Sequence, residues 1–147
     1  MSLFDSFRKS TLEKTFSPEE AANGILLAVI FSDGAVSAEE VETYQLAATR
    51  HPLFRHQTTP DFNRMMDNQI EIIRHHGWMK LVEKSAEDLP TNLRATLFAL
   101  AVDFVLADGR VDAAEERLID RIRELLAIDP ADAETVVAVL CAKNGVN

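Results

Sequence analysis

The chain has 147 residues, of which 47% are hydrophobic and 27% are charged, and its formal net charge at pH 7 is −9. Its length and composition are typical of one soluble globular domain. The negative charge argues against a nucleic-acid groove, which needs a basic surface, and is compatible with a cation site or a basic partner. The most apolar stretch, residues 93–109, contains an arginine and two aspartates and is too short to span a bilayer.

Residues 1–16 are expected to form a separate N-terminal helical segment, in which apolar residues stand beside three basic ones. We expect this segment to dock onto the rest of the protein. The alternative, a position on a membrane surface, is disfavoured by the overall negative charge. The N-terminus shows no secretory signal, and Cys141 has no second cysteine to pair with, so the expected location is the cytoplasm.

Capping residues mark helix starts along the whole chain. Ser17 and Pro18 are followed by Glu20, and the order of a capping residue and then a proline recurs at 59–60 and 129–130. Together with the apolar periodicity, these signals predict helices at about 2–15, 18–32, 37–50, 60–76, 78–87, 91–107, 112–127 and 130–143.

Three glycines, Gly34, Gly77 and Gly109, each follow an apolar-periodic segment, where a left-handed helix cap favours glycine. No stretch shows the sustained alternation of a strand. The expected fold is therefore all-α, a single-domain bundle of about seven to eight helices, with the main domain at residues 17–147.

An internal repeat organises this domain. "FSDGAVSAEE" at 31–40 aligns with "LADGRVDAAE" at 106–115, an offset of 75 residues, and the apolar helices before the two turns also align. We therefore predict two pseudo-symmetric three-helix halves, at about 17–76 and 90–143, that face each other across one core with the 91–107 helix at its centre. The matched positions are Asp33 with Asp108, Gly34 with Gly109, Val36 with Val111, Ser37 with Asp112, and Glu40 with Glu115.

The spacing from glycine to glutamate is that of an EF-hand loop, in which glycine stands at position 6 and a bidentate glutamate at position 12. Positions 1 and 3 should be oxygen ligands, but the first copy has Val29 and Phe31 there, and the second has Phe104 and Leu106. An apolar helix continues where the loop should begin. Neither turn is an EF-hand.

Two interpretations of the repeated carboxylates stay open. Glu40 and Glu115 stand at the third position of a predicted helix, where a capping-box carboxylate binds the N-cap amide. Asp33 and Asp108 stand at the end of a helix, where their charge opposes the helix dipole at a cost of about 0.3–1 kcal/mol. Hydrogen bonds from turn amides would recover this cost, and so would a cation bound by carboxylates and exposed carbonyl oxygens. The sequence favours turn chemistry over metal.

The two turns resemble the signature of the TerB-like family of tellurite-resistance and chemical-stress proteins: an apolar helix ending in Ala/Ser-Asp-Gly, then an apolar residue, then Glu. The opening "MSLFDSF" is also similar to the start of bacterial TerB proteins, and the resemblance covers about residues 17–143. It implies an all-helical fold of about seven helices, and an acidic surface that binds a divalent cation such as Ca²⁺, Mg²⁺ or Mn²⁺. It implies no catalytic residues. By residue match, the implied metal ligands are Asp33, Glu40, Asp108, Asp112 and Glu115, with Ser37 in place of the matching aspartate in the first copy.

Other polar residues favour simpler interpretations. Asp103 is expected on a solvent-facing or close-packed stripe of its helix, with membership of the acidic site as the alternative. His75 and His76 are adjacent and cannot reach one metal from a helix, although Glu71 shares a face with His75. Cys141 is expected in the core. No nucleophile, phosphate loop or cofactor motif accompanies the carboxylates, so an enzyme is not expected.

The leading hypothesis is therefore a non-enzymatic module that presents an acidic, cation-binding site to a protein partner in a stress-response assembly. The alternative is a metal-free helical scaffold for protein interaction, whose Asp-Gly turns only end helices. Neither hypothesis involves nucleic acid, and any membrane contact would be peripheral.

Overall fold

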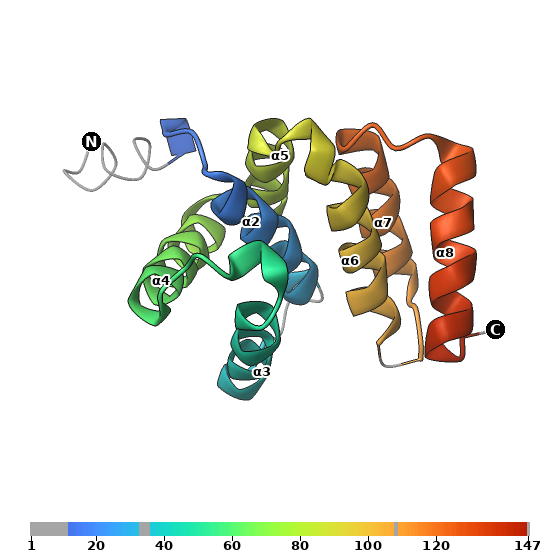
Figure 1. Ribbon diagram of the computed structural model, residues 1–147, viewed down its shortest axis with the longest axis horizontal. Coiled ribbons are helices and arrows are strands. Elements are labelled where there is room, and N and C mark those ends of the chain that lie inside the picture. The colour runs from blue at the N-terminus through green and yellow to red at the C-terminus, as the bar shows by residue number, and fades with distance from the viewer. Residues whose placement is uncertain (1–11, 33–35, 108, 147) are drawn as a thin grey trace.

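The computed structural model describes residues 12–32, 36–107 and 109–146. Helix is the only regular structure in these residues, which confirms the predicted all-α class. Element labels follow Figure 1, where the first labelled helix is α2. The seven labelled helices are α2 (Pro18–Phe31), α3 (Ala38–Thr49), α4 (Thr59–His76), α5 (Trp78–Asp88), α6 (Arg94–Leu106), α7 (Ala113–Leu125) and α8 (Pro130–Asn144).

From residue 18 onward, the predicted helix boundaries agree with the observed ones to within three residues. The largest difference is at the predicted 91–107 helix, which begins as a short 3₁₀ helix, Thr91–Leu93, before α6. In it the Leu93 N–H donates to the Pro90 carbonyl (2.9 Å), a tighter turn that is common where helices begin. A second 3₁₀ helix, Pro52–Phe54, lies in the linker before α4. The predicted 2–15 helix lies almost wholly outside the described residues.

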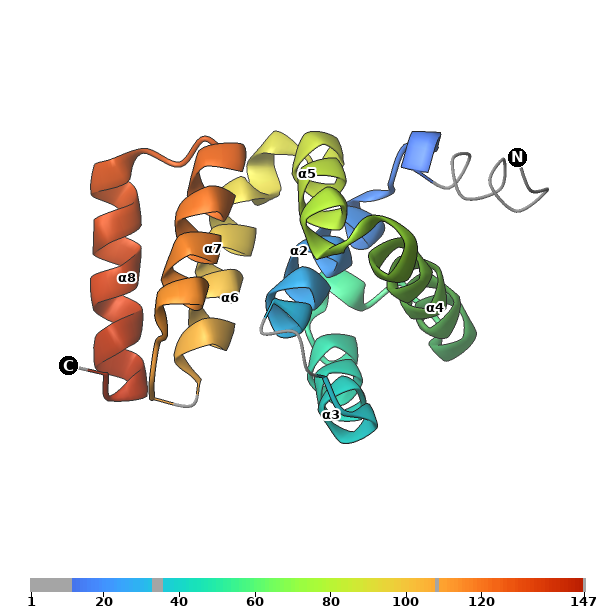
Figure 2. The ribbon, with the colours of Figure 1, turned by 180° about the vertical axis from the view of Figure 1, so that it is seen from behind.

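Helix α2 stands at the centre of the fold (Figure 1). Its residues 21–29 are all buried, and it packs against α4, α5 and α6. A helix segment buried on all sides must be apolar nearly all round, and residues 21–29 meet this condition apart from Asn23. Helix α6 packs on α2 and also on α7 and α8 (Figure 2). The centre is therefore shared by α2 and α6, and is not held by the predicted 91–107 helix alone.

The two predicted halves correspond to α2–α3–α4 and α6–α7–α8, and their packing differs. Helix α7 lies against α6 and buries Leu118 and Ile122. Helix α3 stands away from the other helices (Figure 1), and its fully buried residues are Tyr44 and Ala48. Helix α5 packs on α2, α4 and α7 and so connects the halves. The pseudo-symmetry of the halves stays a prediction.

Side-chain caps set the starts of α2 and α4. At α2, Ser17 Oγ accepts from the Glu20 N–H (3.2 Å), and the Glu20 carboxylate accepts from the Ser17 N–H (3.0 Å). This reciprocal pair is a capping box. Helix α4 has the same arrangement between Thr58 and Asp61, so its N-cap lies one residue before the threonine that the sequence suggested. These caps fix where each helix begins, and thereby which of its faces meets the core.

A buried polar network holds α3 to the core. The side chains of Asn23 and Gln69 are fully buried and that of Tyr44 nearly so. Asn23 Nδ2 donates to Gln69 Oε1 (2.7 Å), the Tyr44 hydroxyl donates to Asn23 Oδ1, and Gln69 Nε2 donates to the Glu20 carbonyl (2.7 Å). Burial raises the pKa of Tyr44 above its ordinary value, so its hydroxyl stays a donor. The Tyr44 ring also packs on Phe104 of α6, with centroids 5.8 Å apart.

The apolar helices are packed on one another. In the part of the chain that the structure describes, no single helix is long and apolar enough to cross a membrane. Residues 78–88 and 91–106 satisfy such a criterion only as a pair, and the pair is bent by 117°. Both segments pack on α2 or on the helices beside it.

Gly24 lies where α2 and α5 touch. A Cβ at this position would lie 1.9 Å from Ser85 Oγ and 3.1 Å from Ser85 Cβ, so only glycine fits without movement of its neighbours. Ser85 is fully buried, and its Oγ has no hydrogen-bond partner among the described residues. Helix α5 therefore docks on α2 through a close contact between two small residues.

Gly77 and Gly109 are used for their backbone conformation. Gly77 joins α4 to α5 at φ 85° and ψ 157°, and Gly109 follows α6 at φ 80°. A Cβ at either position would meet no atom within 4 Å, so space does not require glycine there. Both φ angles are positive, as the glycines predicted. Gly77 is the cap of α4 but with an extended ψ, and the cap of α6 is Ala107, two residues before Gly109. Gly34, the third predicted cap, lies outside the described residues.

We predict that Gly24→Ala lowers the free energy of unfolding by about 1–2 kcal/mol, because overpacking costs about 1–3 kcal/mol and better helix propensity returns up to about 1. Ser85→Ala removes the atom that the new methyl group would strike. The double variant should therefore regain most of the loss, as measured by urea unfolding of all four proteins of the cycle. Additive losses would contradict a direct contact.

At Gly109 we predict a different pattern. Gly109→Val should destabilise the protein by more than about 1 kcal/mol, because a β-branched residue is strained at positive φ. Gly109→Asn should cost less, since Asn tolerates this region better. Denaturant unfolding followed by circular dichroism compares the two, and an equal cost for Val and Asn would rule out a conformational origin.

Candidate functional site

The two Asp-Gly turns connect α2 to α3 and α6 to α7. In Figures 1 and 2, α3 and α7 both begin on the lower side of the molecule, and α2 and α6 stand between them. Asp33 and Asp108, the aspartates of the two turns, lie outside the described residues. The structure therefore describes the predicted site through Glu40, Asp112 and Glu115.

At the second turn, a capping box at the start of α7 brings Asp112 and Glu115 together. Asp112 Oδ1 accepts from the Glu115 N–H (2.7 Å), and Glu115 Oε1 accepts from the Asp112 N–H (3.1 Å). Asp112 is exposed and Glu115 is half-buried. Each carboxylate has a second oxygen that is not part of the box. This is the geometry that the capping interpretation predicts.

At the first turn, Ser37 takes the place of Asp112. Its Oγ accepts from the Glu40 N–H (3.1 Å) and donates to Glu40 Oε1 (3.3 Å), and Glu40 is exposed. A full capping box also needs a bond from the Ser37 N–H to Glu40, and between these two residues it is not formed. The first turn is thus capped by one hydroxyl, and the second by two reciprocal carboxylate bonds.

The described carboxylates of the two turns do not form one cluster. Within residues 12–32, 36–107 and 109–146, no three His, Cys, Asp or Glu side chains lie close enough to hold a metal ion. Glu40 is on α3, apart from the Asp112–Glu115 pair on α7. Neither α2 nor α6 has a basic residue in its last turn, so neither supplies a cation to the negative end of its own dipole.

Asp103 joins α6 to α8. Both of its carboxylate oxygens accept from Lys143 Nζ (2.9 Å each), and Oδ1 also accepts from Asn144 Nδ2 (2.8 Å). These bonds from Asn144 and Lys143 hold the pKa of Asp103 below its ordinary value. We therefore assign Asp103 to an ion pair between helices, a role that neither sequence interpretation included.

The low pKa of Asp103 leads to a pH prediction. Because its folded pKa lies below its unfolded value of about 3.9, the pair stabilises the fold above that pH, and the stabilisation is lost as the pH falls through the folded pKa. The side chains of Asp103 and Lys143 are partly exposed, so the ion pair is weak. Near neutral pH, the free energy of unfolding of wild type should exceed that of Asp103→Asn by only about 0.5 kcal/mol. Urea unfolding of the two proteins between about pH 7 and 3 measures the difference. A difference that persists at the acid end would contradict the assignment.

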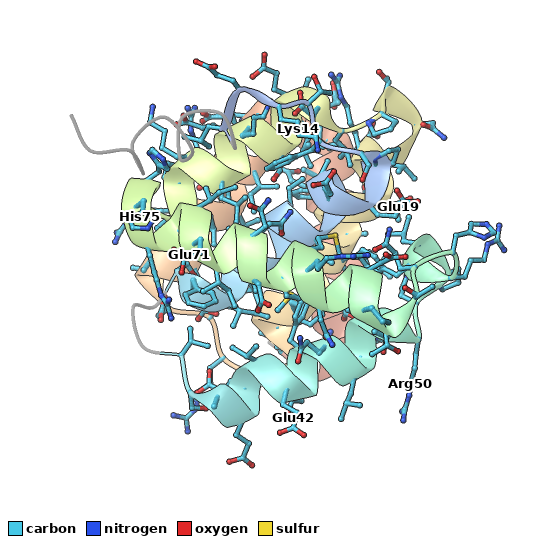
Figure 3. All side chains as sticks on the ribbon, turned by 90° about the vertical axis from the view of Figure 1, so that its left-hand side faces the viewer. Lys14, Glu19, Glu42, Arg50, Glu71 and His75 are labelled. Atoms are coloured by element: carbon cyan, nitrogen blue, oxygen red, sulfur yellow. The ribbon has the colours of Figure 1, made fainter. Side chains whose placement is uncertain are left out.

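The histidines of α4 lie at its C-terminal end. His75 Nε2 is 3.0 Å from Glu71 Oε2, and Arg74 contacts the other Glu71 oxygen (2.9 Å), so the expected shared face of Glu71 and His75 is confirmed (Figure 3). No third metal-binding side chain joins them in the described chain. Basic groups at this end of α4 favour the helix dipole.

A groove between α7 and α8 was not predicted from the sequence. Cys141, expected in the core, is half-buried and lines this groove together with Ile119 and Val137. The periodicity marks these positions as apolar helix positions, and it does not show whether another helix of the same chain covers them. Only the packing of α6, α7 and α8 reveals the groove.

Comparison with known proteins bears on the identity of the chain. A family model described as tellurite resistance protein TerB matches residues 19–138, which include both Asp-Gly turns and the helices from α2 into α8. No curated protein and no solved structure gives a significant match. Because the match covers most of the chain, and because the all-helical fold agrees with it, the chain belongs to the TerB family of tellurite resistance proteins.

Proposed function

We propose that the chain is a non-enzymatic, cytoplasmic stress-response module that presents an acidic, divalent-cation-binding surface to a protein partner. The observation that carries the proposal is the repeated turn: in both copies, a glutamate stands at the third position of the helix that follows Asp-Gly, Glu40 in α3 and Glu115 in α7. Membership of the TerB family supports it, since domains of this family are generally non-enzymatic.

The second turn offers the richer donor set. Asp108, Asp112 and Glu115 would supply carboxylate oxygens, which hard cations such as Ca²⁺, Mg²⁺ and Mn²⁺ prefer. The carbonyl end of α6 would add the negative end of a helix dipole. The first turn has Asp33 and Glu40 but Ser37 in place of Asp112, so it would bind more weakly. We therefore expect two unequal sites.

A specific observation favours the alternative, a metal-free scaffold for protein interaction. The carboxylates of Asp112 and Glu115 already accept helix amides, and a cation beside them would meet the positive end of the α7 dipole. In this alternative the turns only end and begin helices. The two hypotheses differ in what a divalent cation does to stability.

We predict that Ca²⁺, Mg²⁺ or Mn²⁺ stabilises the metal-stripped protein. At a concentration about 100-fold above its dissociation constant, a cation that binds only the folded state adds roughly 2.7 kcal/mol, which for a chain of this size raises the Tm by about 5–10 °C. Sodium at matched ionic strength should do much less, because it only screens charge. Thermal melts with each salt measure the shift, and no cation-specific shift at millimolar concentration would exclude the metal site.

Matched variants separate ligation from capping. Glu20→Gln and Glu115→Gln both change the third-position glutamate of a capping box, but only Glu115 follows an Asp-Gly turn. If a cation binds, Glu115→Gln should reduce the cation shift and Glu20→Gln should leave it unchanged. Asp33→Asn and Asp108→Asn keep the turn hydrogen-bonding capacity and should abolish the shift while leaving the apo fold intact. If the Asn variants unfold without metal, the scaffold hypothesis is correct.

A further inference from the structure

The groove between α7 and α8 has an apolar floor. It comprises two adjoining cavities, of about 780 and 380 Å³, that share Ile119 and Asp120 of α7 and Val137 of α8. Helix α6 supplies the floor, through residues that include Phe98 and Val102. Both α7 and α8 pack on α6, and the groove runs between their facing sides.

The rim of the groove carries acidic side chains without partners. Glu116 and Asp120 lie one turn apart on α7, and Glu134 lies across from them on α8. All three are exposed, and none has an ion pair or a side-chain hydrogen bond among the described residues. Two basic residues also line the groove: Arg123, which donates to the neutral Ile128 carbonyl (3.1 Å) and keeps its charge, and Arg110, which interacts with another residue. The acidic side chains of the lining outnumber these basic ones by three to two. The groove therefore complements cationic groups.

The groove lies where a further helix of the bundle would pack. Helices α6, α7 and α8 alternate in direction (Figure 2), and a fourth helix seated between α7 and α8 would complete a bundle around the apolar floor. An added strand has no counterpart here, because the described chain contains no sheet edge. Grooves between helices are a recurring site for the apolar face of a partner's amphipathic helix.

We propose that this groove binds an amphipathic helix of a partner protein, with apolar side chains on the floor and Lys or Arg side chains paired with Glu116, Asp120 and Glu134. The proposal rests on the proposed function in that it names the surface and the chemistry of a protein partner. It uses none of the predicted cation ligands, so it can fail or hold independently of the metal site.

The test uses a synthetic peptide of about 15 residues, the length of α8, with Leu on one helical face and Lys on both flanks. Its affinity is measured by fluorescence anisotropy in EDTA, which removes any contribution of a divalent cation. We expect a Kd of about 10 µM or tighter. A scrambled peptide of the same composition, and a version with Glu in place of Lys, should each bind at least about tenfold more weakly.

Two charge-reversal variants locate the binding. Glu116→Lys with Asp120→Lys should weaken peptide binding by about fivefold or more. The control variant, Glu39→Lys with Glu42→Lys, makes the same change of charge at exposed positions of α3 (Figure 3). It should alter the affinity for the peptide less than about twofold. Equal effects of the two pairs would show that only net charge matters, and would overturn the proposal.

Cys141 gives a readout that needs no substitution. It is the chain's single cysteine and lines the groove, so a seated peptide should slow its alkylation by iodoacetamide at least about fivefold. Unchanged alkylation at saturating peptide would place the peptide elsewhere and overturn the proposal. If Cys141 is instead shielded as the protein concentration rises, together with dimer formation in sedimentation that Asp120→Lys abolishes, then a second copy of the chain occupies the groove and the assignment of a separate partner is wrong.

Discussion

The fold depends on the burial of the middle of α2, residues 21–29. Nine consecutive buried residues pack this helix against three others, and α5 approaches it closely at Gly24. Gly24 and Ser85 allow that approach, because Gly24 has no side chain and the side chain of Ser85 is only Cβ and Oγ. Once α5 is seated there, it fixes α4 through the single residue Gly77 and α6 through a short 3₁₀ turn.

The helices that follow the two Asp-Gly turns are attached to the core in different ways. Helix α7 is held by apolar side chains against α6, as an amphipathic helix on a core normally is. Helix α3 is held mainly by Tyr44, through a hydrogen bond to Asn23 and a ring contact with Phe104. A repeated motif in the sequence therefore leads to two helix starts with the same capping position and different attachment.

Much of this fold could be predicted from the sequence, because its signals are local. Capping residues, prolines and cap glycines mark helix ends within one turn of the chain, and the family resemblance rests on a short motif that occurs twice and on the opening residues. The features that were missed are not local. In the sequence alone, Gly24 is a residue of low helix propensity inside an apolar helix. Its role becomes clear only when Ser85, 61 residues later, is seen packed against it. The role of Asp103 depends on Lys143, which lies on another helix. The groove exists because no other described helix covers the space between α7 and α8. The predicted ligand set stays a prediction, because Asp33 and Asp108 fall outside the described residues.

The attachment of α3 through Tyr44 has a consequence for motion. A helix whose main anchor is one phenol opens more easily than one that buries a row of aliphatic side chains, so backbone amides of α3 should exchange with solvent well before those of α2. Asn23, which accepts the hydrogen bond from the Tyr44 hydroxyl, is the residue before Gly24. The hydrogen bond that anchors α3 therefore ends one residue away from the close contact between α2 and α5. Local opening of α3 would break the Tyr44–Asn23 hydrogen bond inside the core, whereas opening of α7 would expose Leu118 and Ile122.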